Sequence, residues 1–329
     1  MKKLLVFFLV LSLAIIFQTG LTSVATGAPI VMRLAETHPQ DYPTTKGDYE
    51  FARLVTERTN GRIVVEVFHS KQLGEEKPVI EQVQLGAIDM TRVSISAVSS
   101  FVRDLDAFQL PYLYRDAAHM WKVLNGPIGQ EILKKHEAFN FIGVGWFESG
   151  SRNFYTKKQV KTVGDLKGMK IRVQQAPLMV GLVECLGAVA TPLDYGAVYS
   201  ALQTGVVDGA ENNWPSYLTT SHFEVAKYFI VDEHTRVPEI TVGSKKLFDK
   251  LPKEDVAIIL KAMKDAQPYQ FKLWVDFEKV AEKTVREKGS IITTISPQEK
   301  QKFVDAMKPL YDKQPAEILA VAKKIRDVK

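Results

Sequence analysis

The sequence has few cysteines, no long block of like charges, and none of the common short motifs of catalytic sites. Cys185 is the only cysteine among 329 residues, so no disulfide can form within the chain. Stability must therefore come from a packed core. No G-x-S-x-G or phosphate-binding loop is present, and in "GVGWFESG" Glu148 stands where a dinucleotide loop needs its third glycine. We therefore expect neither an enzyme nor a cofactor.

Metal-ligand spacings are also missing. The six histidines form no H-E-x-x-H or comparable pattern, so we expect no metal site. "DEHT", residues 232–235, contains metal-ligand side chains, but a solvated loop is the simpler interpretation. Cys185 lies in the apolar run "LVECLGAVA" and is expected to be a buried core thiol rather than a nucleophile.

Charge and hydropathy restrict the partners and the destination. The 43 basic and 38 acidic residues are interspersed, which argues against nucleic acid as the partner. Lys2 and Lys3 precede an apolar run over residues 4–17, which is shorter than the ~20 residues that span a bilayer. Small residues follow, with expected cleavage after Ala25 or Ala28. We predict a signal peptide over residues 1–28 and a soluble, exported mature protein.

The remaining chain alternates between strand and helix patterns, which predicts an α/β sheet with parallel pairs. Expected strands are 30–35, 62–68, 87–95, 139–147 and 169–173. Expected helices in the first half are 45–60, 74–86, 117–124 and 128–135. From Pro252 onward the pattern is mainly helical, with Pro268 as a possible kink, a strand at 291–296 and a helix at 298–311. These late helices are expected to brace the molecule.

One unit occurs twice. "VIEQVQLGAIDM" at 79–90 can be laid on "VYSALQTGVVDG" at 198–209, and each reads as a helix, a glycine stop and a short apolar strand. Each also follows a strong strand. Helix–Gly–strand is a common unit, so chance is the alternative; we predict two related lobes with a ligand cleft at the strand ends.

Several polar side chains are candidates for that cleft. Arg172, in the strand "MKIRV", is either an exposed strand residue or an anion clamp that gives a carboxylate two parallel hydrogen bonds. Arg152 is expected in a loop just after a buried strand, and Arg92 within the strand after the first helix–Gly unit; each is a weak signal alone. Asn212 and Asn213, in "GAENNWPSY", suit a hydroxylated ligand, with an Asx turn that caps the next helix as the alternative.

These stretches carry a resemblance to a known family. "HSKQLGEEK", "QLGAIDM", "QLPYLY", "GSRNFYTKK", "DLKGMKIRV" and "PLDYGAVYSALQTGVVDGAENN" occur in family order over nearly all of the mature chain. The chain resembles the periplasmic solute-binding subunit of TRAP transporters, the DctP family. The resemblance implies a type II-like, two-lobed α/β periplasmic binding protein with a ligand cleft and long bracing helices. It would close on an organic acid and deliver it to small and large sodium-driven membrane subunits.

The resemblance also implies ligand contacts. Arg172 would clamp the substrate carboxylate, Arg152 and Asn212 would add contacts, and Tyr195 would pack on the ligand. From the first lobe the implied contacts are Glu76, Arg92 and Ser94. The implied lobes are 29–149 with about 238–277, and 150–237 with about 278–329.

The opening "ETHPQDYPT", with "MTRVS" and "AENN", is similar to the uronate-binding branch of the family. His38, Glu76 and Arg92 would then contact the hydroxyls and the far end of a hexuronate such as glucuronate or galacturonate. For His38 a helix-entry role before Pro39 is the alternative. Other ligands stay open: a C4-dicarboxylate, a keto acid or another sugar acid. An exported sugar-acid enzyme with Glu76 and His38 as its acid and base is the rival class.

Overall fold

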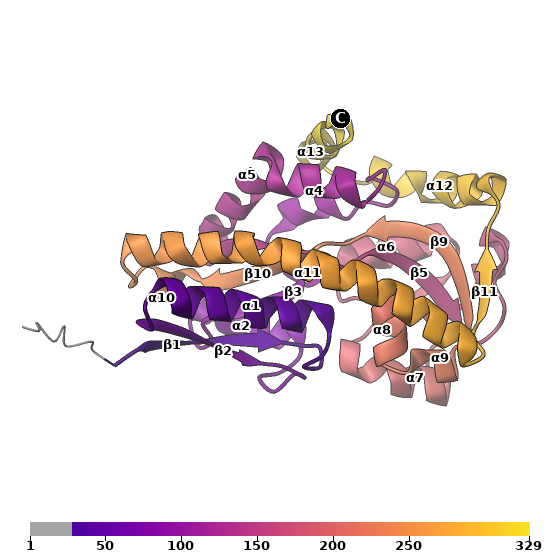
Figure 1. Cartoon of the computed structure of the whole chain (residues 1–329). Helices are drawn as coiled ribbons and strands as arrows, with labels where there is room; N and C mark the ends of the chain where they lie inside the picture. Colours follow the sequence, from indigo (N-terminus) through magenta and orange to yellow (C-terminus); the bar gives the residue numbers. More distant parts are fainter. Residues whose placement is uncertain (1–27) are drawn as a thin grey trace, which may run out of the picture.

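The computed structural model describes residues 28–329, so the predicted signal peptide lies, apart from Ala28, outside the described residues. Two β-sheets lie side by side, each flanked by helices (Figure 1). In spatial order the first sheet consists of β2 (Ile63–Phe68), β1 (Ile30–Glu36), β3 (Met90–Ser94), β10 (Glu239–Ser244) and β4 (Phe141–Phe147). The second consists of β11 (Ile291–Thr294), β9 (Tyr228–Arg236), β5 (Ser151–Thr156), β8 (Gly209–Asn212), β6 (Lys170–Val173) and β7 (Val189–Pro192).

Each sheet carries its own helices, and we call the two assemblies lobe one and lobe two. Lobe one has α1 (Pro43–Arg58), α2 (Glu76–Leu85), α3 (Ile95–Ser99), α4 (Ala117–Asn125), α5 (Pro127–Lys135), α10 (Lys245–Phe248) and the 3₁₀ helices η1 (Arg103–Phe108) and η2 (His136–Phe139). Lobe two has α6 (Pro177–Cys185), α7 (Val198–Thr204), α8 (Trp214–Thr219), α9 (His222–Val225), η3 (Val163–Leu166) and η4 (Tyr195–Ala197).

The two lobes share one plan, as the sequence repeat predicts. β3 pairs parallel with β1 and antiparallel with β10, and β8 pairs parallel with β6 and antiparallel with β5. Gly86 and Gly205 end α2 and α7 in the left-handed conformation, with φ of 80° and 78°. The strands differ from the prediction, because residues 87–89 and 206–208 form bends and each strand begins directly after the aspartate.

Those two aspartates do the same work in each lobe. Asp89 Oδ2 accepts a hydrogen bond from the backbone N–H of Arg33, and Asp208 Oδ2 accepts one from Lys170, both at 2.9 Å. Each side chain therefore ties the bend to the strand beside it. The match in hydrogen bonding shows that the repeated units are structurally equivalent.

Three C-terminal helices join the lobes. α11 (Lys253–Glu287) is 35 residues long and passes through Pro268 without a break, so the possible kink does not divide it. It packs on α1 and β4 of lobe one and on α8 of lobe two (Figure 1). α12 (Pro297–Asp312) packs on α6, and α13 (Ala316–Asp327) returns to η1 and α5. The exact lobe boundaries stay a prediction.

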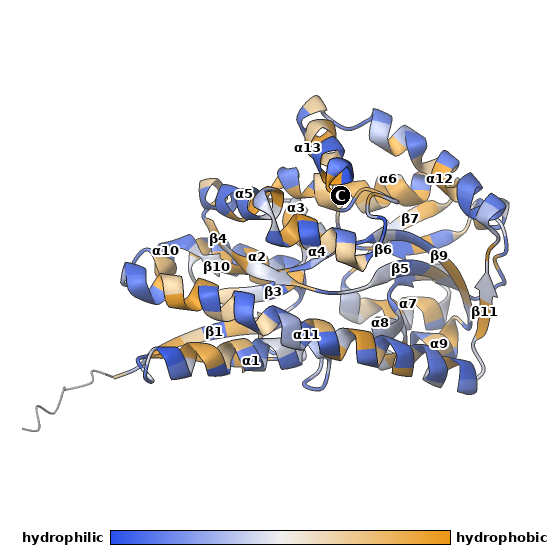
Figure 2. Cartoon of the chain, turned by 45° about the horizontal axis from the view of Figure 1, so that its top comes forward, coloured by the Kyte–Doolittle hydropathy of each residue, from blue (hydrophilic) through white to orange (hydrophobic). Residues whose placement is uncertain are grey.

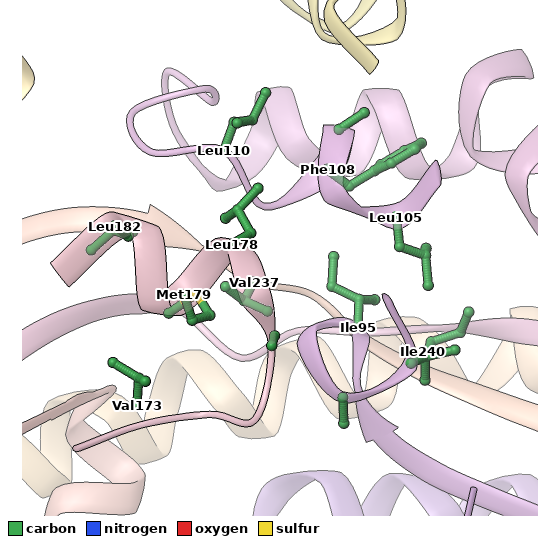
Figure 3. Packing of buried hydrophobic residues seen from close by; sticks show 14 of the residues in the cluster. Ile95, Leu105, Phe108, Leu110, Val173, Leu178, Met179, Leu182, Val237 and Ile240 are labelled. Atoms are coloured by element: carbon green, nitrogen blue, oxygen red, sulfur yellow. The ribbon is translucent and has the colours of Figure 1, made fainter. Parts of the chain in front are cut away.

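One hydrophobic cluster runs between the lobes. It includes Ile95 and Phe108 from lobe one, Val173 and Leu178 from lobe two, and side chains of α12 and α13 (Figure 3). Hydrophilic and hydrophobic residues alternate along the helices (Figure 2), and the buried residues of α11 are mainly apolar. Cys185 packs against this cluster but is only partly buried. Within residues 28–329, no helix has both the length and the apolar character needed to cross a membrane.

Candidate functional site

Arg172 is a buried cation on β6. The strand pattern suggested one buried and one exposed face, but only Lys170 is exposed, because β6 lies between β7 and β8 with α6 packed against it. The residue is 3% exposed, and its Nε and Nη2 donate to the carbonyl oxygen of Leu193 at 3.0 and 2.7 Å. Burial lowers the pKa of Arg172. Among residues 28–329 no carboxylate lies within ion-pair distance of it.

Arg152, on β5, is also buried but is fully engaged. Its Nε and Nη2 form a two-pronged ion pair with the carboxylate of Glu211 on β8. Its Nη1 donates to Asn212 Oδ1 at 3.2 Å. Burial alone would raise the pKa of Glu211, but Arg152 and His234 hold it at about 2. Asn212 and Arg152 are therefore in contact, as the proposed site requires, and Glu211 fixes them.

Arg92, on β3, is equally engaged. Its Nη1 donates to Glu239 Oε2 at 2.6 Å and its Nε to Glu36 Oε2 at 2.6 Å. Its Nη2 contacts Glu36 and lies 2.7 Å from His38 Nδ1. The side chain is completely buried, so the protein itself neutralises this cation.

Several carboxyl groups surround Arg92 in lobe one, and burial favours the neutral form of most of them. Burial raises the pKa of Glu239 to about 7 against the attraction of Arg92. Burial raises the pKa of Glu36 as well, but Arg92 and His38 outweigh it and bring the pKa below its usual value. Burial and the nearby Arg92 lower the pKa of His38 to about 4, so its imidazole is neutral at pH 7. Asp48, buried beside Glu36, has a raised pKa from burial.

The two ion pairs occupy equivalent positions with their charges exchanged. In lobe one Arg92 is paired in register with Thr241, and its partner Glu239 is two residues away on β10. In lobe two Glu211 is paired with Phe154, and its partner Arg152 is two residues away on β5. β3 thus contributes the cation in lobe one, whereas the equivalent strand β8 contributes the anion in lobe two.

Glu76 and Ser94 are brought together in lobe one. Glu76 Oε1 accepts a hydrogen bond from the backbone N–H of Ser94 at 3.1 Å, and burial raises the pKa of Glu76. The Ser94 hydroxyl caps α3 by accepting from the Ser96 N–H at 3.3 Å. His38 is bonded to Glu36 rather than to Glu76, which separates the acid–base pair that the rival enzyme would need.

Aromatic residues bridge the lobes beside these charges. The His38 ring stacks on Tyr42 at 3.9 Å and lies 5.1 Å from the ring of Tyr195 on η4. The Tyr42 hydroxyl is 2.9 Å from Ser216 Oγ in lobe two. The Tyr195 hydroxyl is buried without a hydrogen-bond partner in the described part of the chain, and burial raises its pKa to about 12. These side chains form part of the contact surface between the lobes.

A small cavity lies between the lobes next to Arg172. It measures about 20 Å³. Lobe one lines it with Glu75, Glu76, Lys77 and Ala97, and lobe two with Arg172, Gln174, Gln175, Leu193, Asp194 and Tyr195. The cavity is wide enough for about one water molecule. The lobes therefore meet closely around Arg172, Glu76 and Tyr195.

Sequence reasoning missed several members of this network. The prediction that "DEHT" forms a solvated loop is wrong. These residues lie in β9, and Asp232 and His234 are both fully buried. Glu36 and Glu239 had no local signal, because they join Arg92 only through the sheet. Asn213 caps α8 by accepting from the Ser216 N–H at 2.8 Å, which is the Asx-type role named as the alternative. Among residues 28–329 no group of three or more His, Cys, Asp or Glu is arranged to hold a metal ion.

Two α/β lobes, helices that cross both, and buried polar side chains where the lobes meet define a two-lobed solute-binding protein. The model of the bacterial extracellular solute-binding proteins of family 7, DctP, matches residues 34–317. The chain belongs to this family. This family consists of bacterial extracellular solute-binding proteins. The resemblance drawn from the motifs is therefore confirmed.

Solved structures agree in fold over almost the whole chain. A TRAP periplasmic solute-binding protein from Bradyrhizobium sp. BTAi1, complexed with α/β-D-galacturonate, is 45% identical, has a TM-score of 0.88, and covers 90% of this chain and 99% of its own. One from Pseudomonas putida F1 with bound D-glucuronate is 39% identical, with a TM-score of 0.88 and coverage of 91% and 98%. One from Sulfurospirillum deleyianum with bound succinate is 29% identical, with a TM-score of 0.86 and coverage of 92% and 100%. The chain is thus a TRAP periplasmic solute-binding protein, with uronate-bound neighbours.

Proposed function

We propose that the protein captures a hexuronate, D-galacturonate or D-glucuronate, between its lobes and holds the carboxylate on Arg172. The observation that carries this proposal is the charge state of the three buried arginines. Within residues 28–329, Arg92 and Arg152 each have a carboxylate as partner, whereas the Arg172 guanidinium has only the Leu193 carbonyl. A buried cation without an anionic partner is costly, so a ligand carboxylate at Arg172 supplies the missing charge.

The two lobes then contact different ends of the ligand. Lobe two offers Arg172 to the carboxylate. Arg152 is paired with Glu211 and adds its charge and its contact with Asn212 beside Arg172. Lobe one offers carboxylate oxygens and a neutral imidazole, through Glu76 and His38, which are suited to hydroxyl groups. Arg92 and Ser94 hold the lobe-one groups in place, and Tyr195 packs on the sugar. Since the cavity beside Arg172 is about 20 Å³, ligand entry requires the lobes to separate and close again.

Uronate-bound neighbours support this assignment, at 45% and 39% identity. The succinate-bound neighbour, at 29% identity, favours a second candidate, a C4-dicarboxylate. A dicarboxylate needs cations at both ends, but the lobe-one cation Arg92 is already paired with Glu36 and Glu239. Arg92 therefore has no unpaired charge to offer a second carboxylate, which favours a monoanion.

Other parts of the proposal follow from the family. The protein performs no catalysis, its signal peptide is removed on export to the periplasm, and it delivers its ligand to small and large TRAP membrane subunits.

Calorimetric titration with D-galacturonate, D-glucuronate, succinate and L-malate tests the proposal, with a thermal-shift screen of keto acids and aldonates beside it. Uronates are expected to bind tightly, to raise the melting temperature by mass action, and to be recovered unchanged. Binding of succinate or malate without uronate binding would overturn the ligand assignment. Turnover of the uronate would overturn the assignment as a transport protein.

A further inference from the structure

A buried histidine in lobe two bridges two carboxylates. His234 on β9 is fully buried, and its Nδ1 lies 2.8 Å from Asp232 Oδ2. Its Nε2 lies at an ion-pair distance of 3.5 Å from Glu211 Oε2 and forms no hydrogen bond with the described residues. The ring reaches over β5, where it stacks on Phe154 with centroids 4.4 Å apart. Both ring nitrogens therefore face an anion, an arrangement that favours a proton on each.

The two carboxylates are themselves fixed. Asp232 Oδ1 accepts the Phe154 N–H at 3.2 Å, which ties it to β5. Glu211 forms the two-pronged ion pair with Arg152, whose Nη1 in turn donates to Asn212. A chain of contacts thus runs from Asp232 through His234 and Glu211 to Arg152. It ends at the groups proposed to contact the ligand carboxylate.

The charge of this network depends on the imidazole. Counted over its buried groups, lobe two has three cations, Arg152, Arg172 and His234, and two anions, Glu211 and Asp232, so an imidazolium leaves one positive charge. A neutral His234 would leave none. The pKa values agree with the geometry: burial lowers the pKa of His234, but Asp232 and Glu211 raise it to about 9. The nearby His222 adds no charge, because burial and Arg172 lower its pKa to about 3.

We infer that His234 is a positioning residue of the anion site: as an imidazolium it holds Glu211 against Arg152 and leaves lobe two with a single positive charge for one ligand carboxylate. This inference rests on the proposed function for the identity of the anion. His234 acts through Glu211, not by touching the ligand. The positive charge of His234 also explains how Arg152 and Glu211 can pair within lobe two without leaving the site neutral. Without it, the negative charge of Glu211 on β8 would cancel that of Arg152.

Four variants test the inference in the mature protein. His234→Gln removes the charge, Asp232→Asn removes one carboxylate, and the double variant Asp232→Asn/His234→Gln restores the original net charge. His222→Gln is the matched control, since it replaces another buried histidine of lobe two without changing the charge. The Kd for D-galacturonate and D-glucuronate is measured by calorimetry, with melting temperatures recorded on the same samples.

His234→Gln is expected to weaken binding on the order of ten-fold, from the loss of a unit charge within ~10 Å at an effective dielectric of ~20. The double variant is expected to return to within a few-fold of the wild type, whatever its stability. His222→Gln is expected to keep the wild-type Kd even if its melting temperature falls. An unchanged Kd in His234→Gln, or a double variant weaker than either single one, would overturn the inference, because a purely structural role predicts no rescue.

Imidazole nitrogen NMR of the ligand-free wild type at pH 7.5 reports the protonation state of His234 directly. The measurement requires no ligand, and variants serve only to assign the signal. The His234 signal is assigned by its loss in the variants, or by elimination through replacement of the other histidines. An imidazolium pattern is expected; a neutral ring would overturn the inference even if uronates bind tightly. An imidazolium in a protein that binds no sugar acid would instead overturn the proposed function and leave the charge assignment supported.

Discussion

Replacement of Arg172 by alanine should cost more affinity than any other single change in the site. Arg172 is 3% exposed, and among residues 28–329 no carboxylate pairs with its charge, so a bound carboxylate would be its main partner. Loss of one member of a buried, hydrogen-bonded charge pair costs about 2–5 kcal/mol. At about 1.4 kcal/mol per ten-fold change, the Kd should rise roughly 30-fold to several thousand-fold.

The substitution has a second effect that must be separated from the first. The Leu193 carbonyl would lose both of its donors, which costs about 1–3 kcal/mol of folding stability if the group stays buried. Melting temperatures and Kd values are therefore measured on the same samples. Arg172→Lys keeps the charge but not the planar fork, and its loss of affinity should be intermediate.

Lys170→Ala is the matched control. It removes one positive charge from the same strand, but its side chain is exposed and lies outside the site. Its Kd should stay within about two-fold of the wild type, as expected for a screened surface charge. If Arg172→Ala bound uronate within three-fold of the wild type while Lys170→Ala did the same, the carboxylate would not lie on Arg172.

Three further predictions concern stability. The pKa of His234 is raised from about 6.5 to about 9 in the folded protein. Protonation of His234 therefore contributes about 3 kcal/mol to the free energy of unfolding below pH 6.5, and this contribution is lost as the pH rises through 9. Denaturant unfolding from pH 6 to 10 should show this loss in the wild type and not in His234→Gln. Burial raises the pKa of Asp48, so its charged form opposes folding: Asp48→Asn should raise the melting temperature at pH 8, and a lower value would contradict a neutral carboxyl there. Ser94→Ala should cost about 1 kcal/mol of unfolding free energy through the lost α3 cap, and an unchanged denaturation midpoint would count against that role.

Much of the fold could be predicted because it depends on local patterns. Strand alternation, helical spacing and the two glycine stops gave most element positions, and the repeat gave the two-lobed plan. Arg172 was also accessible, because its strand and its motif are continuous in sequence. The burial of that strand was less accessible, since it depends on neighbours on both sides of β6.

The charge network could not be predicted in the same way. Arg92 meets Glu36 and Glu239 across 56 and 147 residues of chain, so no short window contains the set. "DEHT" was misjudged because polar composition suggests solvent, whereas buried charges can neutralise one another. The sequence did contain one signal. If the alignment of the two repeats is extended by two residues, Arg92 falls on Glu211, and this change from a cation to an anion marks the exchanged ion pairs.

The hydrophobic cluster that joins the lobes has a consequence for unfolding. Side chains of α3 and η1 share one hydrophobic core with those of α6, α12 and α13, so neither lobe has a hydrophobic core that is complete by itself. Heating should therefore melt the whole protein in a single cooperative transition, with equal calorimetric and van't Hoff enthalpies, despite its two sheets. A lobe expressed alone should expose this shared surface and fail to fold.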